Sequence, residues 1–190
     1  MIYLASASPR RQELLRQLGL AFEAFPSHLE ETRQPAETAA DYVVRVALDK
    51  ARHVAARLRE QGRPERPVLG ADTEVVVDDE VFGKPGDARA AAAMLNRLAG
   101  RGHEVLSGIA LIAGGREWTA LSRSRVLLAP LTAVDIAAYC ATGEPLDKAG
   151  GYAIQGRAAA FIERIEGSYS GVMGLPLHEL VMMMRKAGLS

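Results

Sequence analysis

The segment from Val68 to Val77 constrains the fold of this chain more than any other part of its sequence. Its residues, VLGADTEVVV, are mostly apolar and rich in valine, a pattern typical of a buried β-strand. Asp78-Asp79 follows as a tight turn, after which Val81 and Phe82 return as a shorter strand. The sequence therefore predicts a sheet that contains this hairpin.

Helices and strands alternate on both sides of the hairpin. The clearest helix begins at the N-cap Thr38 and ends near Glu60, with one apolar stripe along its length. Further strands are expected at Ile2–Ala5, Phe22–Phe25, Glu104–Ala113, Glu117–Leu128 and Ala159–Ile165, and further helices over Arg10–Leu18, Asp87–Gly100, Thr132–Thr142 and Pro176–Lys186. This order predicts an α/β fold with a mixed sheet, in one domain that covers residues 1–190.

The composition restricts where the protein works and what it binds. Cys140 is the single cysteine and the first residues lack a secretory signal pattern, so we expect a cytoplasmic protein without an internal disulfide. The apolar runs are shorter than the roughly 20 residues that cross a bilayer, so we expect no membrane span. Lys plus Arg balance Asp plus Glu, 23 against 23, which argues against a nucleic-acid partner. An anion site has to be built locally.

A first local anion site is indicated by Ser6-Ala7-Ser8-Pro9-Arg10-Arg11. Two arginines lie in the first turn of a helix, where the helix dipole disfavours cations. Backbone N–H groups, the hydroxyls of Ser6 and Ser8, and the planar forks of Arg10 and Arg11 together suit a polyphosphate. The alternative is a serine-capped surface helix with solvated arginines.

Asp72 and Glu74 interrupt the apolar strand Val68–Val77. Aspartate is disfavoured in strands and costly to bury without a partner. A divalent metal, a lysine or a polarised water would each compensate it, and strand alternation places Glu74 on the same face, where the two carboxylates suit a metal. The alternative is an edge strand with both acids in solvent.

Two lysines are candidates for the same site. Lys50 lies within the apolar stripe of the long helix, between Val43 and Val54, and either reaches the rim of the core or meets a buried acid or phosphate. Lys84 follows the hairpin in Gly83-Lys84-Pro85, where a rigid turn can aim its ammonium group; a solvated turn lysine is the alternative.

The remaining reactive side chains are expected to be structural. The histidines do not have the spacing of metal ligands, and Cys140 has no histidine or second cysteine nearby in the sequence. The spacing of the serines, histidines and aspartates does not indicate a Ser-His-Asp triad. Met182–Met184 is expected in the core and Trp118 in hairpin packing. The four histidines are His28, His53, His103 and His178.

In their order along the chain, these segments resemble the Maf family of nucleotide pyrophosphatases over almost the whole sequence. The matching segments are Ser6–Arg11, Glu30-Glu31, Lys50, Gly70–Thr73, Gly83–Pro85, Asp147–Tyr152, Ile154–Gly156 and Gly167–Leu177. The resemblance implies a two-lobed α/β fold, with an elongated mixed sheet flanked by helices and a central cleft, similar to inosine triphosphate pyrophosphatases.

The resemblance also implies an activity: metal-dependent cleavage of a nucleoside triphosphate into the monophosphate and pyrophosphate. Arg11, Thr73 and Gln155 fall on specificity positions of the branch that acts on dTTP and UTP. Asp72 would be the general base, and Asp72 and Glu31 would hold Mg²⁺ or Mn²⁺.

The remaining implied roles concern the phosphates. Lys50 and Lys84 would stabilise their developing charge, and Ser6, Arg10 and Arg11 would bind them. Glu74 departs from the family, which usually has an apolar residue there. The family and the frequency of twofold assemblies favour a homodimer.

Two alternatives stay open. One is an enzyme of the same fold that prefers 7-methyl-GTP or purines, against which Thr73 and Gln155 argue by resemblance. The other is a regulator of septation that binds nucleotides without hydrolysing them. The inward carboxylate and the two lysines favour chemistry, since phosphate binding alone has little need of a carboxylate.

Overall fold

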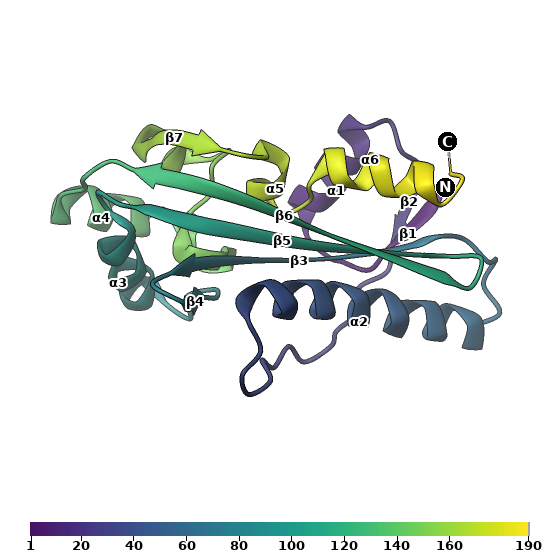
Figure 1. The fold of residues 1–190 in the computed structure, drawn as a ribbon. Helices are drawn as coiled ribbons and strands as arrows, with labels where there is room; N and C mark the ends of the chain where they lie inside the picture. The colour runs from purple at the N-terminus through teal and green to yellow at the C-terminus, as the bar shows by residue number, and fades with distance from the viewer. Residues whose placement is uncertain (190) are drawn as a thin grey trace.

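A computed structural model describes residues 1–189 of the chain. One seven-stranded mixed sheet runs the length of the molecule, in the order β2-β1-β3-β5-β6-β7, with β4 paired to β3 (Figure 1). The first three strands in this order are parallel, and all later pairings are antiparallel. The strands are β1 Ile2–Leu4, β2 Phe22–Ala24, β3 Val68–Val77, β4 Glu80–Phe82, β5 Gly102–Ala113, β6 Arg116–Leu128 and β7 Ile162–Glu166.

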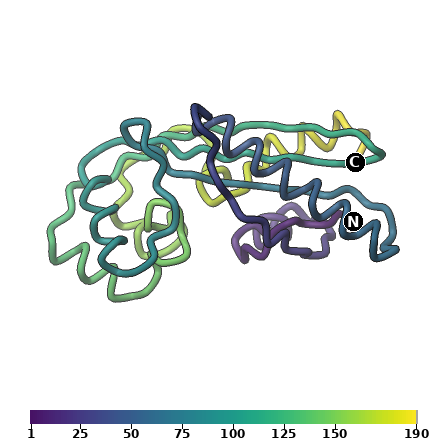
Figure 2. Tube along the Cα trace, turned by 90° about the horizontal axis from the view of Figure 1, so that it is seen from below, coloured from purple at the N-terminus to yellow at the C-terminus, as the bar shows by residue number. Residues whose placement is uncertain are grey.

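Helices cover both faces of the sheet. The long helix α2 lies along one face, whereas α1, α5 and α6 lie on the other, and α3 and α4 gather at the end of the molecule away from the two termini (Figures 1 and 2). The helices are α1 Pro9–Gln17, α2 Ala39–Glu60, α3 Ala88–Leu98, α4 Ala133–Cys140, α5 Tyr169–Met173 and α6 Leu177–Lys186. The α/β class and the elongated mixed sheet flanked by helices are therefore confirmed.

Most boundaries follow the expected local chemistry. The side chains of Thr38, Asp87 and Thr132 each accept a backbone N–H bond at the start of a helix. β3 has the predicted bounds, and Asp78 and Asp79 turn the chain with positive φ angles of 50° and 63°.

Three features of the fold differ from what the sequence predicts. The strand expected at Ala159–Ile165 begins only at Ile162, because the alanine-rich segment before it forms a 3₁₀ turn over Arg157–Phe161. α5 was not predicted, since five residues are too few to show a periodic stripe. Met182 is 41% exposed, while its neighbour Met183 is buried, because one turn of α6 presents only part of its circumference to the core.

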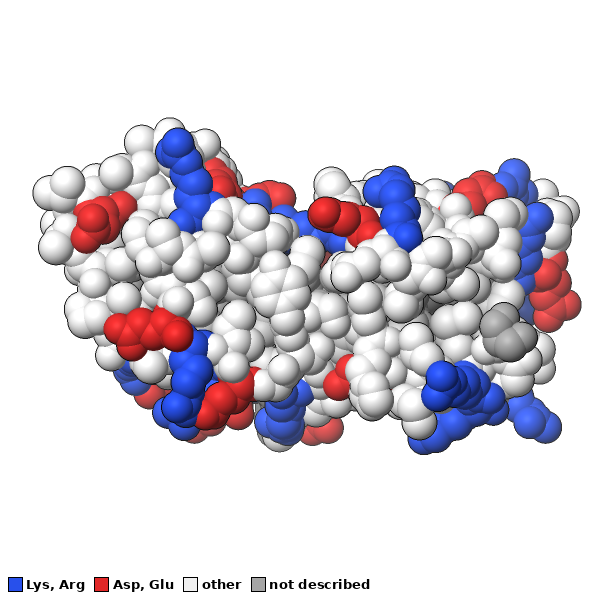
Figure 3. All heavy atoms as spheres, turned by 90° about the horizontal axis from the view of Figure 1, so that it is seen from above, with Lys and Arg blue, Asp and Glu red and all other residues white. Residues whose placement is uncertain are grey.

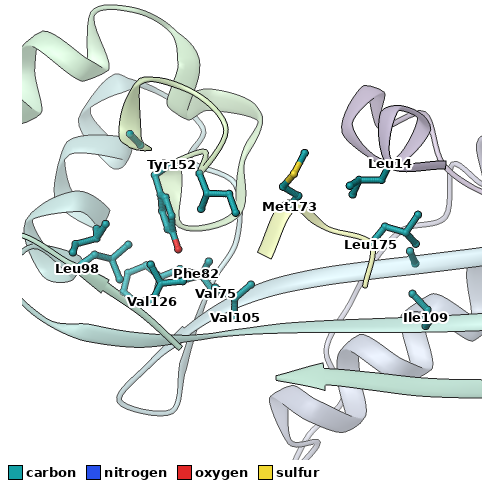
Figure 4. Close-up of a cluster of buried hydrophobic side chains, with 14 of the residues drawn as sticks. Leu14, Val75, Phe82, Leu98, Val105, Ile109, Val126, Tyr152, Met173 and Leu175 are labelled. Atoms are coloured by element: carbon teal, nitrogen blue, oxygen red, sulfur yellow. The ribbon is translucent and has the colours of Figure 1, made fainter. Parts of the chain in front are cut away.

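The largest hydrophobic cluster extends under both ends of the molecule. Leu14 and Leu175 pack at the α1 end, and Phe82, Leu98 and Tyr152 pack at the α3 end (Figure 4). The long strands β5 and β6 run through both regions. Among the described residues, no helix combines the length and the apolar character that a membrane span requires.

Candidate active site

The central strand β3 has an open stretch along one edge. β1 pairs with its beginning and β4 with its end, whereas residues 70–74 have no strand on that edge within the described part of the chain. Consecutive strand residues point to opposite faces, yet Asp72, Thr73 and Glu74 all line one cleft. The cleft therefore curves around the open edge of the sheet and is lined from both faces.

A buried ion-pair cluster lies on the α2 side of this edge. Lys50 Nζ lies 2.8 Å from Asp72 Oδ1 and 2.8 Å from Glu31 Oε1. Lys50 is 6% exposed and Asp72 is 4% exposed, so water screens their attraction weakly. The lysine in the apolar stripe therefore meets a buried acid, and the solvated alternatives for Lys50 and Asp72 are excluded.

Two glycines allow the helix to come close enough for this contact. A Cβ atom on Gly70 would lie 2.0 Å from the carbonyl oxygen of Ala47, and one on Gly108 would lie 2.4 Å from that of Val43. Only a residue without a side chain fits at such distances. Because α2 lies directly on β3 and β5, the side chain of Lys50 reaches the open edge of the sheet.

Glu31 comes from the long loop between β2 and α2. Arg45 of α2 holds this loop, since its guanidinium donates to the carbonyl oxygen of Thr32 at 3.0 Å and pairs with Glu37 at 2.6 Å. The hydrogen bond from Arg45 lowers the pKa of Glu37 to about 2. The loop is thus attached to the same helix that supplies Lys50.

The two carboxylates of β3 retain unpaired oxygens. Asp72 Oδ2 and Glu74 Oε2 are buried and accept no hydrogen bond from the described residues. Burial, followed by the nearby carboxylates of Asp72 and Glu31, raises the pKa of Glu74 to about 8. Burial and the same acids raise the pKa of Tyr42 to about 12. Three acidic side chains, Glu31, Asp72 and Glu74, therefore lie together in this part of the cleft.

The opposite side of the cleft is built around Arg11. Its Nε donates to the carbonyl oxygen of Gly174 at 2.9 Å, and its two other nitrogens donate to Ser6 Oγ at 3.2 Å and Thr73 Oγ1 at 3.4 Å. Thr73 Oγ1 lies in turn 2.9 Å from Ser107 Oγ. These hydrogen bonds fix the position of the guanidinium group. Ser8 lines the cleft, whereas Ser6 is buried beneath its surface and contacts Arg11.

Further cations stand at the mouth of the cleft. Arg10 pairs with Asp147 at 3.2 Å, which links α1 to the loop after α4. Lys148 also pairs with Asp147, and Lys84 lines the cleft from the loop after β4. Figure 3 shows a notch between the two ends of the molecule in which basic and acidic side chains lie together.

The inner part of the cleft is apolar. Val75 and Val105 form its floor, and Tyr152 and Met173 stand on either side of the space above them (Figure 4). Tyr152 is fixed from below, because its hydroxyl lies 2.6 Å from Nε2 of the buried His103. These side chains give the cleft an apolar part beside its charged groups.

The loop that carries Gln155 forms the far wall of this apolar part. Tyr139 donates its hydroxyl proton to Glu144 at 2.7 Å and accepts the backbone N–H of Ala153 at 3.3 Å. The other oxygen of Glu144 accepts the N–H of Arg157 at 3.1 Å. Gln155 lies between the two anchored positions and lines the cleft.

A family model described as "Maf-like protein" matches residues 1–187. The chain belongs to the Maf family. Maf relatives named "dTTP/UTP pyrophosphatase" match it end to end. The relative from Bordetella avium is 49% identical, and the match covers 100% of this chain and 96% of the relative. The relative from Methylococcus capsulatus is 51% identical, and the match covers 99% of this chain and 91% of the relative. A third, from Methylobacillus flagellatus, is 51% identical, and the match covers 100% of this chain and 94% of the relative.

A solved structure is also similar to this Maf protein. It is described as the structure of the Staphylococcus aureus Ham1 protein, is 14% identical, and covers 67% of this chain and 71% of its own, with a TM-score of 0.45.

The structure gathers nearly all site residues that the Maf resemblance suggested. The cleft is lined by Arg10, Arg11, Glu31, Lys50, Asp72, Thr73, Lys84 and Gln155. Ser6 is in contact with Arg11 but does not itself line the cleft among the described residues. Sequence reasoning missed the apolar lining residues Val105 and Met173, because nothing distinguishes them from core residues until the strands and α5 are placed together.

Proposed function

We propose that this protein hydrolyses dTTP and UTP, and modified pyrimidine triphosphates of similar shape, to the monophosphate and pyrophosphate. The observation that carries the proposal is the buried pair of Asp72 and Lys50, which faces a cleft lined by arginines, lysines and apolar side chains. The names of the Maf relatives support the same reaction and the same two nucleotides.

In this proposal the triphosphate lies along the cationic side of the cleft. Arg10, Arg11 and Lys84 bind the phosphate oxygens, and Ser8 and the N–H groups at the start of α1 assist them. Phosphoryl and nucleotidyl transfer depend mainly on positioning and charge stabilisation. These cations therefore lower the barrier without a covalent intermediate.

The pyrimidine base lies in the apolar part of the cleft. Tyr152 and Met173 enclose its faces, and Gln155 and Thr73 supply hydrogen-bonding groups at its edge. A Gln side chain both donates and accepts, so it can match the alternating donors and acceptors of a pyrimidine. Gln155 and Thr73, with Arg11, are therefore our candidates for the choice of nucleotide.

Asp72 is the general base that takes a proton from the attacking water. Its Oδ1 is held by Lys50, while its buried Oδ2 has no other partner among the described residues. The ammonium group of Lys50 fixes the orientation of this carboxylate. The water then attacks the α-phosphorus, and the proton passes to Oδ2 as the bond to the leaving pyrophosphate breaks.

The site also fits a divalent cation. The described residues contain no cluster of three metal-binding side chains, but Mg²⁺ is commonly bound by one or two carboxylates together with substrate phosphates. Asp72 would hold it through one lone pair of its free oxygen, which leaves the other lone pair open to the attacking water, and Glu31 at the rim is a candidate for a second ligand. When bound, Mg²⁺ or Mn²⁺ polarises phosphate oxygens and lowers the pKa of coordinated water.

The test is pyrophosphate release from dTTP, UTP, CTP, dATP, GTP and 7-methyl-GTP, each with and without Mg²⁺ or Mn²⁺. The expected result is turnover of dTTP and UTP that Asp72→Asn abolishes. Asp79→Asn is the matched control, since it changes an exposed aspartate in the turn after the same strand. Preferential turnover of 7-methyl-GTP would contradict the specificity, and tight binding without any hydrolysis would support a regulator instead.

A further inference from the structure

The carboxylate of Glu74 has no role in the chemistry proposed above, although it lies within the cleft. It is 9% exposed, and its Oε2 accepts no hydrogen bond from residues 1–189. A buried carboxylate without a partner carries a large desolvation cost. A residue retained at such a cost, beside a reactive group, indicates a ligand that the side chain itself binds.

Asp72, on the same face of β3, also has a buried carboxylate oxygen without a hydrogen-bond partner among residues 1–189. Its Oδ1 is bound to Lys50, and its Oδ2 is buried without a partner among residues 1–189. Residues two apart on a strand have Cα atoms about 7 Å apart and side chains that point the same way. A small cation between the side chains of Asp72 and Glu74 is therefore within reach of both free oxygens.

Glu31 differs from these two residues. Its Oε1 is paired with Lys50 at 2.8 Å, and its side chain is 38% exposed. Lys50 and water already stabilise this carboxylate, so Glu31 needs a further cation less than Glu74 does.

The charges lead to the same conclusion. Lys50 pairs with both Glu31 and Asp72, so two carboxylates share one buried ammonium group, and the ionised form of Glu74 would add a further negative charge beside them. Lys84 lines the cleft but is itself exposed to water. A divalent cation held by these carboxylates would balance the negative charge and reduce their repulsion of the anionic triphosphate.

We propose that Glu74, together with Asp72, directly binds the divalent cation of this site, and that Glu31 acts mainly through Lys50. The inference rests on the proposed function, because nucleotide phosphates and water complete the coordination. Two carboxylates with substrate phosphates are the usual environment of protein-bound Mg²⁺.

The experiment measures Mn²⁺ binding by electron paramagnetic resonance, in the presence of a dTTP analogue with a non-hydrolysable α,β-imido bridge. Glu74→Gln is expected to weaken Mn²⁺ binding at least about tenfold, and Glu31→Gln no more than about threefold. Glu74→Asp keeps the charge but shortens the reach, so an intermediate loss is expected. Glu104→Gln is the control, since Glu104 lies on the neighbouring strand and is exposed.

The inference is overturned if Glu74→Gln binds Mn²⁺ as tightly as the unchanged protein, or if Glu31→Gln carries the larger loss. Thermal unfolding of each variant verifies that it is folded. Mn²⁺ binding that depends on Glu74, without any release of pyrophosphate, would refute the proposed function alone. Pyrophosphate release with unaltered Mn²⁺ binding in Glu74→Gln would refute this inference alone.

Discussion

The buried His103 makes the stability of this protein depend on pH in a calculable way. Its imidazole lies under the apolar part of the cleft, 3% exposed, with Nε2 against the Tyr152 hydroxyl and Nδ1 without a partner among residues 1–189. Burial lowers the pKa of His103 to about 4, from its usual 6.5. The neutral ring is therefore the form that the folded protein accommodates.

The sign and size of the effect follow from this difference. Between about pH 6.5 and pH 4 the unfolded chain binds a proton at this histidine and the folded protein does not, so stability falls as the pH is lowered. A pKa difference from 6.5 to about 4 corresponds to a ceiling of about 3.4 kcal/mol. Local rearrangement reduces this value, and we expect a loss of about 2 kcal/mol.

His103→Gln tests this prediction, with His178→Gln as control because His178 is exposed. Urea unfolding is followed by the fluorescence of Trp118, the single tryptophan, at pH 7.5, 6, 5 and 4.5. We expect His103→Gln to be less stable at neutral pH, because it loses the hydrogen bond to Tyr152. Its free energy of unfolding should then fall less between pH 7.5 and pH 4.5 than that of the unchanged protein. Equal pH dependence in His103→Gln and in the unchanged protein would refute the reasoning.

Three further predictions concern packing and charge around the cleft. Gly70→Ala forces a backbone clash with α2 and should destabilise the protein by about 3 kcal/mol or more in urea unfolding. Gly86→Ala is the control and should change stability little, because the space around Gly86 is open. Equal effects of the two substitutions would contradict the close contact between α2 and β3. Lys50→Met leaves the buried Asp72 without its cation and should cost about 3–5 kcal/mol at neutral pH. An unchanged melting temperature would contradict this prediction. Asp147→Asn removes the ion-pair partner of Arg10 at the mouth of the cleft. Because the Arg10–Asp147 pair is partly exposed, we expect only a two- to fivefold lower KM for dTTP at low salt. A raised KM would contradict this prediction.

The sequence was sufficient for features that local chemistry controls. A hydroxyl or carboxylate side chain at Thr38, Asp87 or Thr132 marks a helix start on its own, and the valines of β3 require a buried strand wherever it lies. Lys50 was recognisable because a charge within an apolar helical stripe must find a partner. Lys50, Asp72 and Arg11 conflict with purely structural explanations, and the structure brings these three residues to one cleft.

Other features depend on the tertiary arrangement. The open edge of β3 exists because β1 ends early and β4 begins late, which no local pattern encodes. The cleft walls come from β5 and α5, which are distant in sequence, and the contact of Arg10 with Asp147 spans 137 positions. The pairing of Lys50 with Glu31 was likewise unpredicted, because the intervening loop has no periodic signal.

The most direct test of the proposed reaction is hydrolysis of dTTP with Mg²⁺ in ¹⁸O-labelled water, followed by mass spectrometry of both products. Water that attacks the α-phosphorus leaves one ¹⁸O atom in dTMP and none in pyrophosphate, and Asp72→Asn should slow this reaction about 10²- to 10⁴-fold. Label in pyrophosphate, formation of dTDP with inorganic phosphate, or full activity of Asp72→Asn would each contradict the account.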